Sequence, residues 1–455
     1  VGTAYGLTPT MIGDILESID PKRKGRVVNF AEHLAKDILP LDIMKSDNWF
    51  NHYVSTLSDL DEEIIKHVPQ GGNWQDIPEH VPSQRLQQIR DMSAERGVVR
   101  TTYYGRLRPE QPSYTIATYY NRPGNGTNIH PWEDRTISSR EAARLQSFPD
   151  GYIFYGSEGG IRTQIGNAVP PLLAYSLGKH IGNRYGFGTC VDAFAGAGGL
   201  SYGLELAGWN VLAANDNDKY ASITYRANRP TEQVASENRK KTFFMEGDIS
   251  SEKIQEEFIS GIQGKLGNEE LDLLVGGPPC QGFSHAGFRR PDDARNDLAS
   301  IYLKLAATMK PKTFVLENVE GLLTYNGGQV VRDIIKTLSE IGYKVEAPWV
   351  VNAEQFGAPQ MRRRVLIVAN RKEIVPVMQH LFRKCAGRRI GKAVEQPHLA
   401  LPVTVSEALV DLPPLKKRRF LKGLNEVNNL YSRWLKGLID TEDFLADRSK
   451  IKGYS

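Results

Sequence analysis

The sequence lacks the features of a membrane protein and of a protein held together by crosslinks. None of its apolar runs approaches the roughly 18 residues that a membrane-spanning helix needs, and its N-terminus lacks the charged and then apolar layout of a signal peptide. Its three cysteines, Cys190, Cys280 and Cys385, have no Cys-x-x-Cys spacing and cannot all pair, which argues against a disulfide framework and a structural zinc site. We therefore expect a soluble protein of a reducing cytoplasm, with neither a membrane nor a metal as partner.

The chain also has little net charge. Its 57 Lys and Arg residues against 53 Asp and Glu residues give a formal charge of +4, which excludes a polycation of the histone or ribosomal-protein kind. Any affinity for nucleic acid must come from local patches. The candidate basic runs are Lys416–Arg419, Arg383-Lys384 with Arg388-Arg389, and Arg362–Arg364. Most such runs are solvated surface, and only the last lies inside a motif.

The order of apolar segments predicts at least one large α/β unit. A chain of 455 residues is too long for one ordinary core. From about residue 189 onward, short β-branched runs alternate with helical stretches, as in a parallel sheet covered by helices. Strands are expected at Cys190–Phe194, Asn210–Ala214, Thr242–Met245, Leu271–Val275, Thr313–Leu316, Lys344–Val350 and Val365–Val368, and the clearest helices at Asp297–Met309 and Gln329–Ile341.

The first 185 residues show a different pattern, with loops rich in Pro, Gly and Asn followed by two helices. A capping-box pattern opens the predicted helix Arg140–Gln146, and two prolines precede a helix that runs to about Asn183. A glycine-rich joint, Gly182–Gly188, then leads into the first strand of the sheet.

Three consecutive strand ends carry residues suited to an adenosine. The segment Val191–Leu200 ends a strand with a small-residue turn, so backbone N–H groups can approach a ligand closely. The carboxylate of Asp216 could accept from two ribose hydroxyls, and Asp248 beside the apolar Ile249 could accept from an adenine amino group. Each element alone is as readily a structural turn, and Ser201 replaces the third glycine of the dinucleotide fingerprint. Together they favour S-adenosylmethionine as the cofactor.

The fourth predicted strand ends in a loop, Gly276–Ser284, that contains Cys280. In a doubly wound sheet the loops after the first and fourth strands face one crevice, so this thiol would lie beside the methyl donor. A lone cysteine is usually an inert small hydrophobe, and Cys190, inside a predicted buried strand, fits that description. Two prolines and flanking glycines around Cys280 instead fix the backbone and expose the thiol, which favours a nucleophile.

The fifth predicted strand ends in Glu317–Val319, which places a carboxyl group at the same sheet edge as the thiol. Such a group is often a helix cap or a surface ion pair, but beside Cys280 it could be held protonated and donate to a ring nitrogen. C5 of cytosine is not nucleophilic, and addition of a thiolate at C6 with N3 protonated makes it enamine-like. A thiol, an acid and a methyl donor therefore predict C5 methylation of cytosine.

Several long motifs resemble the cytosine-5 DNA methyltransferase family. Phe194–Leu200 resembles its cofactor loop, Pro278–Gln281 its nucleophile loop, Glu317–Val319 its acid motif and Gln360–Arg364 its QxRxR motif. The resemblance implies an α/β fold, the doubly wound, Rossmann-like sheet of S-adenosylmethionine-dependent methyltransferases, with a second, smaller target-recognition domain. It also implies methyl transfer to C5 of a cytosine that is flipped out of a specific duplex DNA sequence.

The resemblance assigns roles to single residues. Cys280 is then the nucleophile, and Glu317 contacts N3 and the exocyclic amine. Arg364, with Arg362 nearby, supports the cytosine O2 and the active-site loop. The residues expected to contact the cofactor are Phe194, Gly196, Gly198, Asp216, Asp248, Ile249, Gly277, Pro279, Leu298 and Asn167.

Two further expectations concern the surroundings of the site. Where relatives often place an aromatic residue against the adenine, this chain has Asn217, so Phe194 or Ile249 must cover more of the ring. The segment Gln281–Asp297, rich in Gly, Arg and Asp, resembles the mobile loop that closes over DNA after the base has flipped out.

The motif blocks occur in a circularly permuted order. Arg135–Pro149 resembles the ninth block of the family and Gln164–Pro170 the tenth, which usually follow the other blocks and here precede them. Thr404–Pro413 resembles the segment that leads into the recognition region, and Asn51–Trp74 the segment that leaves it. The break therefore falls inside that region, and residues from about 414 to 455 and from 1 to about 50 should meet as one DNA-reading domain.

These blocks define four expected parts of the chain. Residues 1–118 belong to the target-recognition domain, and 119–185 hold the ninth and tenth blocks with a helix that completes the cofactor pocket. Residues 186–375 form the catalytic domain, and 376–455 are a linker and the rest of the recognition domain.

Alternatives to a DNA enzyme are a tRNA cytosine-5 methyltransferase and a non-catalytic binding module. The long segments at both ends favour duplex DNA, because tRNA enzymes have a reduced recognition region, and the retained Cys280 and Glu317 argue against a non-catalytic module. An amino-group methyltransferase would carry an aromatic residue at position 280. The absence of large chromatin-reading modules suggests a prokaryotic enzyme, and the resemblance implies the modification enzyme of a restriction-modification system. We also expect a monomer, with a companion restriction endonuclease but no stable complex, in the cytoplasm and on the nucleoid through DNA.

Overall fold

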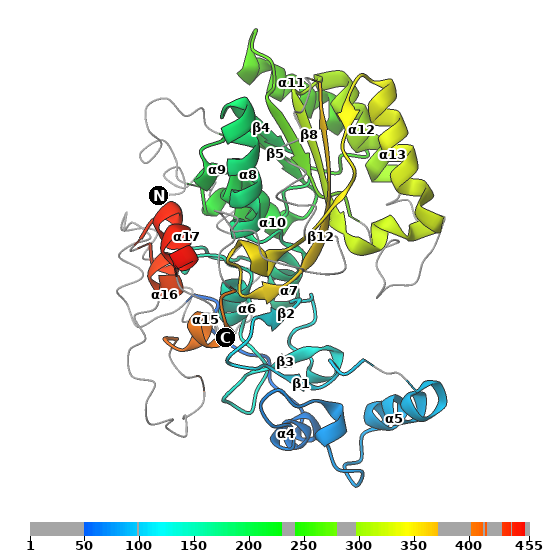
Figure 1. Ribbon diagram of the computed structural model, residues 1–455, viewed down its shortest axis with the longest axis vertical. Helices are drawn as coiled ribbons and strands as arrows, with labels where there is room; N and C mark the ends of the chain where they lie inside the picture. Colours follow the sequence, from blue (N-terminus) through cyan, green and yellow to red (C-terminus); the bar gives the residue numbers. More distant parts are fainter. Residues whose placement is uncertain are drawn as a thin grey trace.

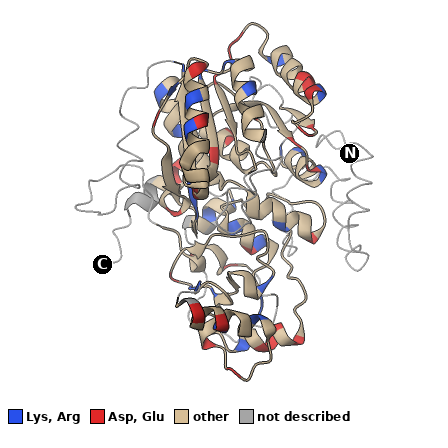
Figure 2. Ribbon diagram, turned by 90° about the vertical axis from the view of Figure 1, so that its right-hand side faces the viewer, with Lys and Arg blue, Asp and Glu red and all other residues tan. Residues whose placement is uncertain are grey.

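The structure is a computed structural model that describes residues 50–97, 100–229, 242–279, 297–371, 402–412, 415, 430–437 and 439–450. Figure 1 shows a large lobe built around a sheet and a smaller lobe at the far end of the molecule. Basic and acidic residues are mixed on both lobes (Figure 2). No described helix is long and apolar enough to cross a membrane.

An eight-stranded sheet forms the centre of the large lobe. Its strands are β4 (Thr189–Asp192), β5 (Asn210–Asp216), β6 (Phe243–Glu246), β7 (Leu273–Gly276), β8 (Thr313–Val319), β9 (Lys344–Val345), β10 (Trp349–Asn352) and β12 (Arg363–Asn370). Their order in space is β10-β12-β8-β7-β4-β5-β6, with β9 paired to β12. Strands β4 to β8 are parallel, and β12 runs antiparallel to β8. The order reverses between β4 and β7, so the loops after these two strands face one crevice.

The seven predicted strands are all present, and one of them is divided. The expected strand Lys344–Val350 is two short strands, β9 and β10, separated by residues 346–348. Pro348 lies in this gap, and a proline has no N–H group with which to continue a strand ladder.

Helices cover both faces of the sheet because alternate strand residues point to opposite sides. Leu274 packs with α11 (Glu252–Leu266), α12 (Asp297–Met309) and α13 (Gln329–Glu340), and its neighbour Leu273 packs with α8 (Pro171–Tyr185) and α9 (Gly199–Ala207). The predicted helices at 297–309 and 329–341 are thereby confirmed. Cys190 lies in the second cluster with no exposed surface, and burial raises the pKa of its thiol, as fits a small core residue.

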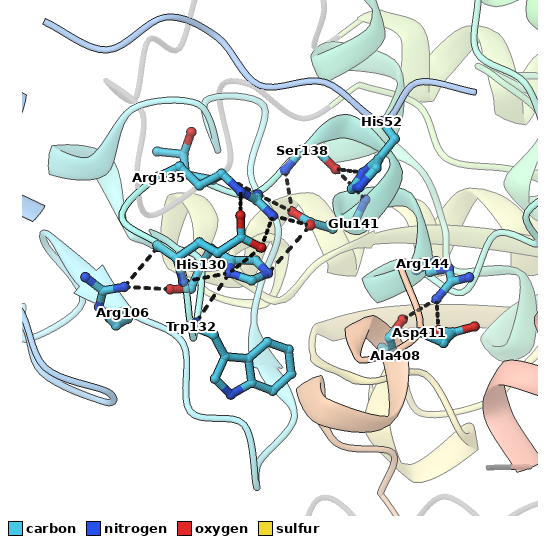
Figure 3. A network of polar contacts seen from close by, with 12 residues as sticks. His52, Arg106, His130, Trp132, Arg135, Ser138, Glu141, Arg144, Ala408 and Asp411 are labelled. Carbon is cyan, nitrogen blue, oxygen red and sulfur yellow. Dashed lines mark hydrogen bonds and ion pairs between the residues drawn. The ribbon is translucent and has the colours of Figure 1, made fainter. Parts of the chain in front are cut away.

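The predicted capping box forms at the start of α6 (Ser139–Leu145). The Ser138 hydroxyl accepts from the Glu141 N–H at 3.1 Å, and the Glu141 carboxylate accepts from the Ser138 N–H at 2.7 Å. Arg135 donates to both Glu141 oxygens, at 2.8 and 2.7 Å, and to Glu133 (Figure 3). This buried network fixes the loop before α6, where a capping box alone would leave a buried carboxylate without its counter-charge.

Arg144 joins α6 to segments from the far end of the sequence. Its guanidinium donates to both oxygens of Asp150 at 2.7 Å. It also donates to the Ala408 carbonyl at 2.8 Å and to Asp411 at 2.5 Å (Figure 3). Its own carbonyl accepts from the Tyr431 hydroxyl at 2.5 Å. The helices α15 (Val405–Leu409) and α16 (Leu430–Leu435) therefore pack on α6, and α17 (Thr441–Lys450) follows them.

The small lobe has its own core around α4 (Asp59–Lys66), α5 (Gln84–Arg96) and the short strands β1 (Gly105–Arg106) and β3 (Thr127–Ile129). Of the two segments predicted to meet, residues 1–49 and all of 414–429 except residue 415 lie outside the described residues, as do the basic runs at 383–389 and 416–419. That meeting and the predicted division into four parts remain predictions.

Candidate active site

The loop between β4 and α9 has the glycines that its turn requires. Gly196 and Gly198 have φ angles of 53° and 95°, a region that favours glycine. The Gly196 N–H donates to the Asp216 carboxylate at 2.7 Å, and the Asp218 N–H donates to its other oxygen at 2.9 Å. The loop and the end of β5 are thus held together, and burial raises the pKa of Asp216. Among the described residues, a Cβ on Gly196 would point into open space.

The end of β6 lies beside the end of β5. The Gly247 N–H donates to the Asp216 carbonyl at 2.9 Å, which brings the residues after β6 to the same edge. Ile249 is buried and Asp248 is exposed, with one carboxylate oxygen accepting from the Ser250 N–H at 2.9 Å. Asn217 is exposed at the same edge. The three strand ends predicted to contact one ligand therefore lie together.

The end of the tenth block packs against the start of α9, directly after the loop of residues 193–198, which we call the glycine loop. A Cβ on Gly199 would lie 2.3 Å from the Val169 carbonyl, and one on Gly203 would lie 2.3 Å from the Pro171 carbonyl. Glycines at both positions let α9 approach the start of α8 this closely. Exposed Asn167, at the end of α7 (Glu158–Asn167), is thereby brought near the loop.

Two aromatic rings pack together where β4 and β7 end. Phe194 and Tyr302 meet edge to face with centroids 5.5 Å apart, and a Cβ on Gly276 would lie 3.0 Å from both rings. Leu298, at the start of α12, packs partly buried against the same cluster. Phe194 therefore lies at the switch point of the sheet, where β4 and β7 end.

The acid motif is bonded to the nucleophile loop. The Asn318 side chain donates to the Pro278 carbonyl at 3.2 Å, and a Cβ on Gly277 would lie 2.8 Å from Glu317 Oε2. Pro279 is exposed at the end of the described segment. Cys280 and the predicted mobile loop up to residue 296 lie outside the described residues.

Glu317 forms an ion pair with Arg364. They lie diagonally across the neighbouring strands β8 and β12, where Glu317 is opposite Leu366 and Arg364 opposite Val319, and Arg364 Nε lies 2.9 Å from Glu317 Oε1. Both side chains are about nine-tenths buried. Burial lowers the pKa of Arg364, and the attraction of Glu317 opposes that shift. The pair fixes the orientation of the carboxyl group.

Arg362 binds backbone carbonyl groups of segments that precede the sheet in the sequence. Its guanidinium donates to the Ile116 carbonyl at 3.1 Å and to the Gly166 carbonyl at 2.8 Å. Burial lowers its pKa, and so does the nearby charge of Arg364. In the described part of the run 362–364 only Arg363 is well exposed, paired with Glu320 at 2.7 Å, so this run is not the basic surface patch that its charge suggests.

Replacement of Arg362 by lysine is expected to lower the free energy of unfolding by about 2 to 4 kcal/mol, because one ammonium group cannot reach both carbonyls and leaves a buried acceptor unsatisfied. Urea unfolding measures the change. The matched control is Arg363→Lys, whose exposed ion pair predicts a change within about 0.5 kcal/mol. Equal effects of the two substitutions would contradict the structural role of Arg362.

Sequence patterns did not predict the contacts that Gln360 of the QxRxR motif makes. Gln360, in the short strand β11 (Gln360–Met361), accepts from the Ile116 N–H at 2.7 Å and donates to Gln146 at 2.8 Å. It ties β11 to β2 (Ser113–Tyr114) and to the end of α6. The motif marks Gln360, but only the fold shows that its partners come from upstream blocks.

The sheet order, the glycine loop at its switch point and the loop after β7 define the fold of an S-adenosylmethionine-dependent methyltransferase. The model of the family "C-5 cytosine-specific DNA methylase" matches residues 25–183 and 188–438, and the chain belongs to this family.

Two curated relatives illustrate the extent of the similarity. The chain is 36% identical over 230 residues to Type II methyltransferase M.AgeI of Thalassovita gelatinovora, a match that covers 49% of this chain and 50% of the relative. It is 32% identical over 258 residues to Type II methyltransferase M.XorII of Xanthomonas oryzae pv. oryzae, which covers 55% and 54%. The chain thus spans about half the length of the curated relatives it matches.

Proposed function

We propose that this protein methylates C5 of a cytosine in a specific duplex DNA sequence, with Cys280 as the nucleophile and S-adenosylmethionine as the methyl donor. The observation that carries the proposal is the bond from Asn318 to the Pro278 carbonyl, which holds the Glu317–Arg364 pair against the loop that continues into Cys280. Membership of the cytosine-specific family supports the choice of base.

The described residues fit the proposed cofactor. Asp216 offers a carboxylate at a strand end for two ribose hydroxyls, and the glycine loop has an open face at Gly196. Phe194 and Ile249 offer apolar surface for the adenine. When bound, S-adenosylmethionine supplies an electrophilic methyl group. The other proposed contacts are Gly198, Asp248, Gly277, Pro279, Leu298 and Asn167.

The protein's own residues act on the base in three steps. The Cys280 thiolate adds to C6, while Glu317 holds a proton at N3 so that the ring accepts the electron pair without building up charge. C5 then becomes the nucleophile for the methyl group that bound S-adenosylmethionine would supply, with S-adenosylhomocysteine as the leaving group. Transfer of the C5 proton to water, departure of the thiolate from C6 and return of the N3 proton to Glu317 restore the aromatic ring. Arg364 keeps Glu317 directed at the base throughout.

The biological setting is part of the proposal. Relatives such as M.AgeI and M.XorII are named Type II methyltransferases, which supports a role as the modification enzyme of a restriction-modification system. We place the protein in a prokaryotic cytoplasm, as a monomer on DNA from which the target base is flipped out, with a companion endonuclease that acts separately.

Labelled S-adenosylmethionine tests the substrate. We expect the protein to transfer label to duplex DNA and not to tRNA, and bisulfite mapping of the product should locate 5-methylcytosine within one short sequence. Transfer to tRNA alone would replace the DNA proposal with the RNA alternative, and label on an exocyclic amine would overturn the covalent route.

The permuted order of blocks belongs to the same proposal. The family match consists of two segments, 25–183 and 188–438. The upstream blocks pack against the loops of the downstream ones, through Arg362 and Gly166 and through the close approach of Gly199 to Val169. These contacts support an order that differs along the chain while the assembled site is retained.

A reordered chain tests the permutation. If residue 455 is joined to residue 1 by a flexible linker and the chain is opened within 186–188, the variant should fold and methylate the same DNA sequence, since tertiary contacts rather than chain order assemble the site. Thermal unfolding and bisulfite mapping check this. A folded reordered chain that no longer recognises the target would show that residues 1 and 455 are not close together.

A further inference from the structure

Two side chains, Tyr152 and Arg229, donate hydrogen bonds to carbonyl groups of the glycine loop, and neither residue belongs to the motif of that loop. The Tyr152 hydroxyl donates to the Ala197 carbonyl, and Arg229 Nη2 donates to the Gly198 carbonyl at 3.2 Å. Arg229 Nη1 also lies 3.5 Å from the Tyr152 oxygen. A Cβ on Gly198 would lie 2.6 Å from Arg229 Nη1 and 2.8 Å from that oxygen. Both side chains are therefore packed directly against the turn.

Arg229 is itself fixed from three sides. Its guanidinium carbon lies 3.3 Å from the centroid of the Tyr225 ring, its Nη1 donates to the Tyr225 carbonyl at 3.1 Å, and its Nε lies 3.4 Å from Glu205. The Tyr225 hydroxyl donates a hydrogen bond to the Ser201 hydroxyl at 3.0 Å, and the Ser201 hydroxyl donates to Asp192 at 2.7 Å. The contacts of Arg229 and Tyr225 therefore connect β4, α9 and α10 (Lys219–Ala227).

Tyr152 reaches the loop from the upstream part of the chain. It follows the ninth block and packs its ring against Phe148, Phe154 and Tyr202 at centroid distances of 4.8 to 5.5 Å. Only 2% of its surface is exposed, and burial raises the pKa of its hydroxyl. The hydroxyl therefore stays protonated and remains a donor to Ala197.

We propose that Tyr152 and Arg229 are positioning residues for the methyl donor. By binding the carbonyls of Ala197 and Gly198, they fix the peptide planes of the loop, and the N–H groups and the open face at Gly196 are left for the ligand. A loop held in its binding conformation loses less entropy when the ligand binds. This inference rests on the proposed function and goes beyond it, because neither residue belongs to a motif that defines the site.

The test compares two buried tyrosines. Tyr152→Phe removes the donor to Ala197, and the matched control Tyr120→Phe removes an equally buried hydroxyl that donates to Ser139 at 2.9 Å, in the same hydrophobic cluster. Both variants should lose a similar amount of thermal stability. Only Tyr152→Phe should raise the Kd of S-adenosylmethionine and of S-adenosylhomocysteine by calorimetry, by about three- to tenfold, as expected for one hydrogen bond.

Kinetics separate positioning from a structural role. For Tyr152→Phe the KM for S-adenosylmethionine should rise in step with the Kd, while kcat at saturating cofactor and the KM for DNA stay within about twofold of wild type. Arg229→Lys should raise the Kd by at least as much, because lysine cannot both stack on Tyr225 and bind the Gly198 carbonyl. It provides a second measurement if the tyrosine variant folds poorly.

The outcomes distinguish the two proposals. If the wild-type protein does not bind S-adenosylmethionine, the proposed function is wrong. If the wild type binds it while both folded variants keep its affinity, the proposed function stands and the positioning role is wrong. Equal loss of affinity in Tyr120→Phe and Tyr152→Phe would also overturn the inference, since it would reduce the effect to general destabilisation.

Discussion

Replacement of Cys280 by alanine should abolish methyl transfer to duplex DNA, with a loss on the order of 10⁴-fold or more, because the addition at C6 has no other nucleophile. The Kd of S-adenosylmethionine should change little, since the thiol acts on the base and the cofactor residues remain. Single-turnover transfer of label measures the first effect and calorimetry the second.

The chain contains its own control for this experiment. Cys190→Ala removes a thiol that is fully buried in β4, so it should lower the free energy of unfolding by about 1 kcal/mol and leave transfer intact. DNA with fluorine at C5 of the target cytosine extends the test. The final step cannot remove fluorine as it removes a proton, so wild type and Cys190→Ala should form adducts that survive denaturation, and Cys280→Ala should not. Transfer or adduct formation by Cys280→Ala would refute the covalent route.

Replacement of Glu317 by glutamine should lower kcat/KM by about 10²- to 10⁴-fold. The amide keeps the size of the side chain but cannot transfer a proton to N3. It also leaves Arg364, nine-tenths buried, without its counter-charge, so some thermal stability should be lost as well. Steady-state transfer to target DNA and thermal unfolding together measure the two effects.

Glu320→Gln provides the comparison for this second prediction. Glu320 lies three residues away and pairs with exposed Arg363, so the same chemical change there should leave both transfer and stability near wild type. Transfer by Glu317→Gln within tenfold of wild type at unchanged folding would remove Glu317 from the proposed proton route.

The sequence predicted the parts of the fold that depend on local periodicity. The strands and the helices at 297–309 and 329–341 follow from runs of apolar residues, and the capping box at Ser138 follows from a pattern of four residues. The meeting of Asp216, Gly247 and the glycine loop at one edge followed from the rule that the carboxyl ends of parallel strands share an edge. The full order of the strands came from the structure.

The long-range polar contacts could not be predicted in the same way. Arg362 looked like part of a basic patch and proved to be buried, because its partners, the carbonyls of Ile116 and Gly166, lie about 200 or more positions earlier in the chain. Tyr152 and Arg229 fall outside the motifs that define the family, and a backbone carbonyl as partner leaves no mark in the sequence. The same holds for Arg144 and Ala408.

Arg144 has a consequence for how two helices from the far end of the sequence are held. Its guanidinium holds the end of α15 through Ala408 and Asp411, and its carbonyl holds the start of α16 through Tyr431. One residue of α6 thus fixes the positions of the chain on both sides of residues 413–429. Both attachment points belong to the buried core, so α15 and α16 keep their places on α6 through these contacts rather than through the residues that connect them.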